Sequence, residues 1–97
     1  MRTAVVGHVE WGEFAEVERV PQPGEIVHAR RTFSEPAGGG SVAAAALARL
    51  TGECTFYTAL GDDELGERSR ARLGALGVRV CAATRADEPT RRAFVVS

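Results

Sequence analysis

Residues 36–50 read PAGGGSVAAAALARL, so three consecutive glycines run directly into an alanine-rich segment. Glycine lacks a Cβ atom, which lets a ligand or a second backbone segment approach closely. The segment that follows has helical composition, with Ser41 as its expected N-cap and Gly52 as its expected stop. Free N–H groups at such a helix start favour an oxygen-rich ligand. The stretch therefore predicts either a binding site or a tight turn before a close-packed helix, and the glycines alone leave both open.

The segments around this stretch alternate between strand and helix patterns. Residues 64–75 predict a second helix, and short apolar runs predict strands at residues 3–6, 53–60, 78–82 and 91–96. The first run has the pattern of a buried strand, and the last is as apolar as a central strand. Strands that alternate with helices indicate a parallel α/β sheet with right-handed crossovers. A chain of 97 residues is expected to form one domain.

Two further strands are predicted between the first strand and the glycines, over about residues 13–33. Residues 14–20 alternate between apolar and charged side chains, and residues 25–33 form a second β-rich run. Pro21-Gln22-Pro23-Gly24 between them predicts a turn. The charged faces of this flap indicate that it lies outside the main sheet. A flap beside a glycine-rich loop is expected to be either a lid over a site or a simple exposed hairpin.

The overall composition excludes several classes of protein. Twelve basic and thirteen acidic residues nearly cancel, which argues against a nucleic acid or an anionic membrane as partner. The N-terminal apolar run is too short for a signal peptide or a membrane span, so a cytoplasmic protein is expected. Cys54 and Cys81 have no ligand partners at metal-binding spacing, and both are predicted to be small buried hydrophobes.

Several side chains follow directly after the predicted strands, where open α/β sheets place their ligands. His8 follows the first strand and is expected to be a surface or core histidine rather than a catalytic one, because it has no visible partner. Trp11 is expected to be a packing residue. Asp62 and Asp63 precede the second helix and are expected to cap it rather than to bind a metal.

The order of these motifs resembles that of the PfkB carbohydrate kinases, the family that includes ribokinase, fructokinase and adenosine kinase. The resemblance covers nearly all of the chain, and the order and spacing of its parts make it specific. In chain order the parts are Val5-Val6-Gly7, Pro21-Gln22-Pro23-Gly24-Glu25, Gly38-Gly39-Gly40, Gly61-Asp62-Asp63-Glu64-Leu65-Gly66, and Pro89-Thr90 followed by Ala93-Phe94-Val95.

The resemblance implies a ribokinase-like α/β fold, here incomplete, with a parallel sheet flanked by helices and a small β lid. Residues 1–97 would be the N-terminal, substrate-side part of the kinase domain. Members transfer the γ-phosphoryl group of ATP, with Mg²⁺, to a hydroxymethyl group of a sugar or nucleoside. The family's Gly-Ala-Gly-Asp run, which carries the catalytic base, is absent. No catalytic residue, ATP site or metal ligand is therefore expected here, and the chain alone is expected to be inactive.

The resemblance also implies a set of substrate contacts that departs from the family pattern. Glu10 stands where members usually have Asn, and Gly12 where they have Asp. Val42 replaces an Asn, and Arg91 replaces the glycine of Pro-Thr-Gly. These changes imply an altered or larger acceptor, or a loss of catalysis. The expected substrate-binding residues are Glu10, Gly12, Gly38, Gly39, Gly40, Val42 and Thr90.

A second function remains open, that of a non-catalytic binding or interaction module built on the same fold. Open strand edges in the flap can pair with another chain. A homodimer through the lid strands is therefore compatible with both functions. The expected partner in the kinase function is a small sugar or nucleoside, with no nucleic acid and no membrane involved.

Overall fold

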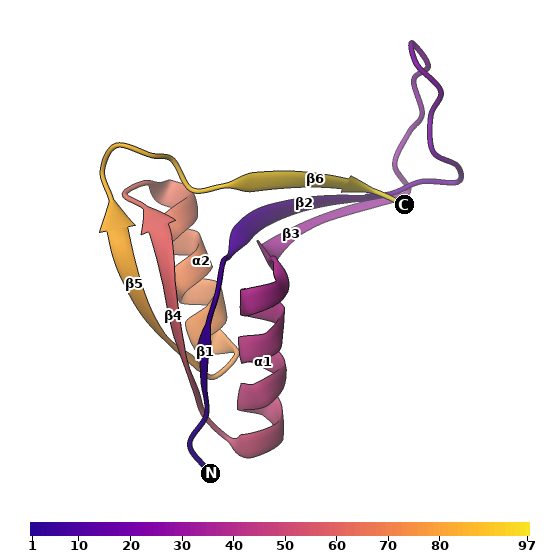
Figure 1. Cartoon of the computed structure of the whole chain (residues 1–97). Helices are drawn as coiled ribbons and strands as arrows, with labels where there is room; N and C mark the ends of the chain where they lie inside the picture. Colours follow the sequence, from indigo (N-terminus) through magenta and orange to yellow (C-terminus); the bar gives the residue numbers. More distant parts are fainter.

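The computed structural model describes all residues from 1 to 97 and contains two three-stranded sheets and two helices (Figure 1). The order of strands and helices is the one predicted from the sequence, and the helix over residues 64–75 is confirmed. The elements are β1 Ala4–Val6, β2 Glu10–Glu16, β3 Arg31–Ala37, α1 Gly39–Thr51, β4 Cys54–Gly61, α2 Glu64–Ala75, β5 Val78–Arg85 and β6 Arg92–Val96.

The main sheet is parallel, as predicted, with the strand order β1-β4-β5. Both helices cover the same face of it (Figure 1), because each crossover moves one strand further in the same direction. The core lies between this face and the helices, with Phe56 completely buried near its centre. The buried residues of the core are Val9, Ala44, Ala48, Cys54, Phe56, Leu60, Leu73 and Val78.

The opposite face of the main sheet is open in this chain. Val6, Tyr57 and Cys81 lie next to each other on the three strands, and all are exposed. The prediction of a buried Cys81 is therefore wrong, whereas Cys54 is buried as expected. The prediction of a buried first strand is also wrong, since β1 is an edge strand and Val6 is 83% exposed. Alternation along a strand sends neighbouring side chains to opposite faces, and the helices cover only one.

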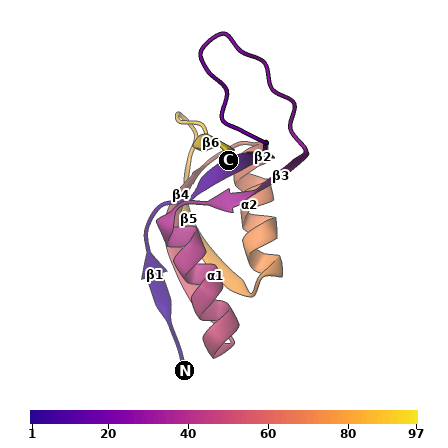
Figure 2. The ribbon, with the colours of Figure 1, turned by 90° about the vertical axis from the view of Figure 1, so that its right-hand side faces the viewer.

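The small sheet, with the order β3-β2-β6, projects from the carboxyl end of the main sheet (Figures 1 and 2). Strands β2 and β3 are antiparallel, and β6 runs parallel to β2. The flap is thus separate from the main sheet, as its charged faces predicted. The strand predicted at residues 91–96 is confirmed as β6. Although its composition is as apolar as that of a central strand, β6 lies at an edge of this small sheet, and Phe94 is 72% exposed.

The predicted boundaries of the flap strands are also wrong. The strands cover residues 10–16 and 31–37, rather than lying within residues 13–33. Residues 17–30 form the long irregular loop that extends beyond the sheet in both figures. Pro21 and Pro23 lack the N–H group that strand pairing requires. The predicted turn contains a backbone hydrogen bond of 3.0 Å, from the Glu25 nitrogen to the Gln22 oxygen.

The ends of the two helices are capped differently. Gly38, with φ of 94°, is the N-cap of α1, so the prediction of Ser41 is wrong. Ser41 lies inside the first turn, where its hydroxyl donates to the Ala37 carbonyl at 2.6 Å. Gly52 ends α1 with φ of 93°, as predicted. Asp63 caps α2 and accepts from the Gly66 nitrogen at 2.8 Å, so of the two acidic residues expected to cap this helix it is Asp63 that does so.

Candidate functional site

The glycine stretch lies against the loop that follows β1, at the carboxyl end of the main sheet. A Cβ atom on Gly40 would lie 2.6 Å from the His8 carbonyl oxygen and 2.9 Å from the Gly7 carbonyl carbon. A Cβ atom on Gly38 would lie 3.0 Å from the His8 ring. A Cβ atom on Gly39 would meet nothing within 4 Å. Gly38 and Gly40 thus provide close backbone packing, while Gly39 faces open space at the edge where such sheets bind ligands.

The start of α1 carries an uncompensated positive dipole end. Its first turn has no acidic residue, and its N-cap forms no side-chain hydrogen bond. Helix α2, by contrast, begins with the Asp63 cap followed by Glu64 and Glu67. Val42, on the first turn of α1, is 61% exposed. This end of α1 is therefore electrostatically suited to a hydroxyl-rich or anionic group.

A cavity of about 200 Å³ lies at the same edge of the main sheet. We call it the arginine cavity, because Arg85 and Arg91 are the charged residues around it, and no Asp or Glu lines it. Its other lining residues are Gly7, His8, Thr58, Ala59, Leu60 and Gly61. The sequence did not single out Arg85, because β5 was expected to end at Ala82 and instead continues to Arg85. A cross-strand pairing of Gly61 with Arg85 extends β5 to this edge.

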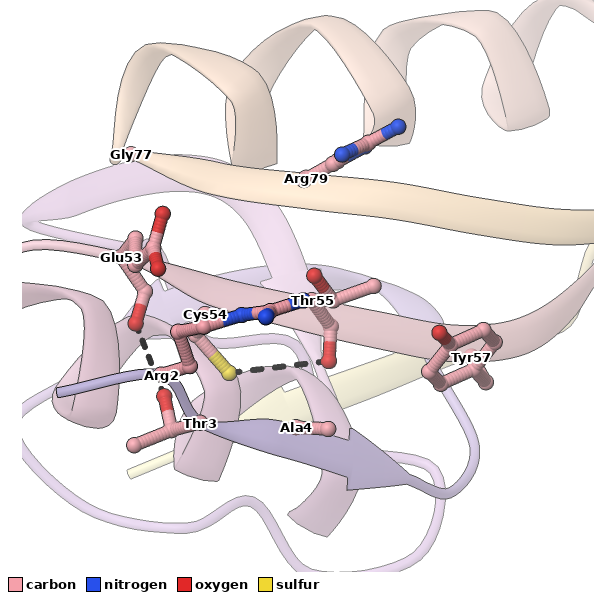
Figure 3. A pocket seen from close by; sticks show the side chains of 9 residues that line it. All are labelled: Arg2, Thr3, Ala4, Glu53, Cys54, Thr55, Tyr57, Gly77 and Arg79. Atoms are coloured by element: carbon pink, nitrogen blue, oxygen red, sulfur yellow. Dashed lines mark hydrogen bonds between the residues drawn. The ribbon is translucent and has the colours of Figure 1, made fainter.

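A larger cavity, of about 300 Å³, lies at the opposite end of the main sheet (Figure 3). It is formed around the amino-terminal residues of the three strands, and Figure 3 shows the Thr3 hydroxyl bonded to the Glu53 carbonyl at 2.8 Å. None of the predicted site residues lines it. Its position away from the carboxyl end of the sheet argues against a shared role with the glycine stretch.

Asp63 and Thr90 join the main sheet, α2 and the approach to β6. The Thr90 nitrogen donates to Asp63 Oδ2 at 2.7 Å, and the Thr90 hydroxyl donates to Oδ1 at 2.6 Å. The same hydroxyl accepts from the Gly61 nitrogen at 3.0 Å. The Thr90 hydroxyl and backbone N–H lower the pKa of Asp63 below its ordinary value. Thr90 is 5% exposed, so its hydroxyl is used in these hydrogen bonds, which we call the Asp63–Thr90 junction.

Trp11 packs at the base of the small sheet, as the sequence predicted. It is 3% exposed, and the Arg68 guanidinium of α2 lies 4.5 Å from the centre of its ring. The indole nitrogen donates to Glu13 Oε1 at 3.0 Å. Glu13 also accepts from the Ser34 hydroxyl, and this bond is the main reason why the pKa of Glu13 lies below its ordinary value. These contacts connect α2 with strands of the small sheet.

Gly12 and Glu10 lie on β2, close to the glycine stretch. A Cβ atom on Gly12 would collide with the ring of Phe14, which stacks on Phe33 at 4.9 Å between ring centres. The aromatic pair thus occupies the space that a larger side chain at position 12 would need. Glu10 is half-buried at the start of β2 and is paired with Ala37.

No group of three or more His, Cys, Asp or Glu side chains lies close enough together to hold a metal ion. Neither helix has the length and hydropathy needed to cross a membrane.

Comparison with known proteins matches residues 2–97 to the family described as pfkB family carbohydrate kinase. The chain is similar to a ribokinase from Arabidopsis thaliana complexed with ribose and ATP, with 31% identity, a TM-score of 0.76, and coverage of 97% of this chain and 31% of that one. It is similar to a ribokinase from Cryptococcus neoformans in complex with ADP, with 30% identity, a TM-score of 0.75 and coverage of 99% and 30%. No curated protein matches.

A phosphofructokinase-2 from Escherichia coli, in complex with fructose-6-phosphate, is similar in fold, with 24% identity, a TM-score of 0.78 and coverage of 99% and 30%. The chain therefore spans about 30% of the length of these structures. Together the comparisons confirm the predicted ribokinase-like fold.

Proposed function

The chain belongs to the pfkB family of carbohydrate kinases, and from this premise we propose that it forms the acceptor-binding side of a kinase. The enzyme would transfer the γ-phosphoryl group of ATP to a hydroxymethyl group of a sugar or nucleoside. The main supporting observation is the packing of the glycine-rich start of α1 on the loop after β1, at the base of the small sheet. The use of ATP fits a cytoplasmic location, which we include in the proposal.

In this proposal the residues at the carboxyl end of the sheet position the acceptor. The open backbone at Gly39 and the start of α1 would donate N–H groups to acceptor hydroxyls. Glu10 and Val42 lie at the ends of neighbouring elements and would border the acceptor, as would Gly38, Gly40 and Gly12. Thr90 would act by fixing the junction with Asp63. The small sheet would serve as a lid that excludes water from the reacting groups.

ATP and Mg²⁺ would supply the phosphoryl group and the neutralisation of its charge. We assign no residue of this chain to ATP or Mg²⁺, and no group of three or more His, Cys, Asp or Glu side chains in it could hold a metal ion. The catalytic base is likewise not assigned to any of these residues. The chain's own contribution is orientation of the acceptor and exclusion of water.

An assay of ADP release by the full natural protein tests the proposed reaction. ATP is supplied with a panel of pentoses, hexoses, sugar phosphates, sugar acids and nucleosides. We expect ADP release that depends on one acceptor class. If every acceptor fails while the protein binds itself or another protein, the interaction module is the correct function.

Val42→Asn tests the role assigned to the start of α1. The side chain is 61% exposed, so an amide should cost the fold little and should add a hydrogen bond to an acceptor hydroxyl. We expect KM for the best neutral acceptor to fall by about three- to tenfold. Ala43→Asn, also exposed and one position along the helix, is the control. Equal effects of the two variants on KM would contradict the assignment.

We also propose that two copies of the protein associate through the small sheet. Strands β3 and β6 each have a free edge, and Phe33, Phe94 and Val95 are exposed on this sheet. Exposed apolar edge strands favour pairing with a second chain. The interaction module remains an alternative use of the same surface.

Phe94→Asp is expected to convert such a dimer to a monomer. The residue is 72% exposed, so the substitution should leave the free energy of unfolding within about 0.5 kcal/mol of wild type. Light scattering during size-exclusion chromatography gives the mass. Leu50→Asp, at a site 81% exposed at the end of α1, is the control. A wild-type monomer, or an unchanged dimer in Phe94→Asp, would refute this association.

A further inference from the structure

We propose that the acceptor of this kinase carries an acidic group, a phosphate or a carboxylate, and that the arginine cavity binds it. The inference rests on the proposed function and specifies its substrate class. It starts from the charge distribution at the carboxyl end of the main sheet.

The arginine cavity has a cationic lining. Arg85 comes from the end of β5, and Arg91 directly precedes β6, so two separate segments bring positive charge to one cavity of about 200 Å³. No carboxylate lines it. Arginine offers a planar pair of donors that matches a phosphate or carboxylate, and such charged bonds are stronger than neutral ones. A hydroxyl group alone would use these donors poorly.

Arg91 is held in place by its backbone while its side chain is free to bind. Its carbonyl accepts from the Trp11 nitrogen at 2.7 Å, and its neighbour Thr90 is held by the junction with Asp63. The Arg91 guanidinium forms no ion pair and no hydrogen bond in this structure. Its backbone is therefore anchored, and its guanidinium, which has no other partner, is available to bind an anion in the adjacent cavity.

Arg85 forms only an exposed ion pair, with Glu88. Its guanidinium lies 2.7 Å from Glu88 Oε1, and both side chains are about half exposed. Exposed pairs of this kind contribute little free energy, so a bidentate anion can compete with Glu88. Asp62 directly follows the cavity-lining Gly61, but its side chain is exposed and does not line the cavity.

Two further features of this edge favour an anion. His8 lines the cavity, and its ring lies against Gly38 at the start of α1. The start of α1 has no acidic residue in its first turn. The positive helix end thus adds to the field of the two arginines rather than opposing it.

The test uses the full natural protein with Arg91→Gln and Arg85→Gln variants. Steady-state KM and kcat are measured for neutral sugars, sugar phosphates and sugar acids, and KM is also measured for ATP. Arg79→Gln is the matched control, because Arg79 is exposed at the other end of the same strand and is absent from the cavity. Direct calorimetric binding of each acceptor class and of inorganic phosphate accompanies the kinetics.

We expect an acidic acceptor to be preferred, and the comparison of sugar phosphates with sugar acids distinguishes a phosphate from a carboxylate group. Arg91→Gln should raise the KM for this acceptor at least about tenfold and change kcat less. Arg79→Gln should change neither KM nor kcat. Binding should weaken as the salt concentration rises. Arg91→Asp should lose more affinity than Arg91→Gln if charge is what matters.

Two kinetic outcomes would overturn the inference, and calorimetry tests it if no acceptor is phosphorylated. A neutral acceptor with an unchanged KM in Arg91→Gln would refute it while leaving the kinase function intact. A rise in the KM for ATP alone would assign the arginines to the nucleotide phosphates instead. If no acceptor is phosphorylated, the proposed kinase function is refuted, but calorimetry still tests whether the arginine cavity binds anions. Binding of a sugar phosphate or sugar acid that is lost in Arg91→Gln supports anion binding. The absence of such binding refutes it.

Discussion

Gly40→Ala is expected to destabilise the protein by about 3 kcal/mol or more, or to prevent folding, because a methyl group there has no space. Its Cβ would lie 2.6 Å from the His8 oxygen and 2.9 Å from both the Gly7 carbonyl carbon and the His8 nitrogen. All three are backbone atoms, which cannot rotate away as a side chain can. Separation of α1 from β1 would be needed to accommodate the methyl group.

Gly39→Ala is the matched control for this prediction. It introduces the same methyl group one residue earlier on the same helix, where nothing lies within 4 Å. We expect it to be neutral or slightly stabilising, because alanine favours helix more than glycine does. Urea denaturation, followed by the fluorescence of the single tryptophan Trp11, measures both variants. Similar free energies of unfolding for the two variants would show that close packing at Gly40 is unimportant.

Asp63→Asn is expected to destabilise the protein by about 2–3 kcal/mol, although the shape of the side chain is unchanged. The carboxylate accepts from three donors: Gly66 N, Thr90 N and the Thr90 hydroxyl. An asparagine amide places an NH₂ group against at least one of them, which leaves a partly buried donor without an acceptor. Asp62→Asn is the control, because the Asp62 side chain is exposed and forms no hydrogen bond in the structure.

The pH dependence of stability provides a second measure of Asp63. Its folded pKa is lowered, chiefly by the Thr90 hydroxyl, so ionised Asp63 favours the folded state. In the unfolded chain the pKa of an Asp side chain is about 3.9. The stabilisation is therefore fully present above this pH and is lost as the pH falls toward the folded pKa.

Urea titrations from pH 7 down to pH 3 should show a smaller acid-induced loss in Asp63→Asn than in wild type or Asp62→Asn. Parallel curves for all three proteins would contradict the assignment. The same junction holds Thr90 beside Gly61, so a destabilised Asp63 variant should also loosen the approach to β6, which amide exchange can detect.

Local patterns predicted the helices and most of the topology. Residues 64–75 carry helical spacing and a capping Asp63, and both are confirmed. Gly52 is confirmed as the end of α1. Helix ends depend on residues close in sequence, whose side chains and backbone interact directly, so the sequence alone identifies them.

Strand positions in the small sheet were predicted less well. The alternating pattern at residues 14–20 is real, but strand pairing uses residues 10–16 because β2 must meet both β3 and β6. The exposure of Cys81 depends on which face the helices cover. Strand boundaries and side-chain exposure of this kind depend on contacts with residues far away in the sequence, so a local pattern cannot predict them.

The order of elements, the family resemblance and an acidic cap on α2 could be predicted from the sequence, because each follows from patterns among residues close together along the chain. For the glycines the sequence left a binding site and a tight turn both open. The packing of sheets and helices places Gly40 rather than Gly39 against backbone atoms, and it joins Thr90 to Asp63 by hydrogen bonds. It also brought Arg85 and Arg91 to one cavity. Each of these depends on contacts between segments distant along the chain, which become defined when the sheets and helices pack together.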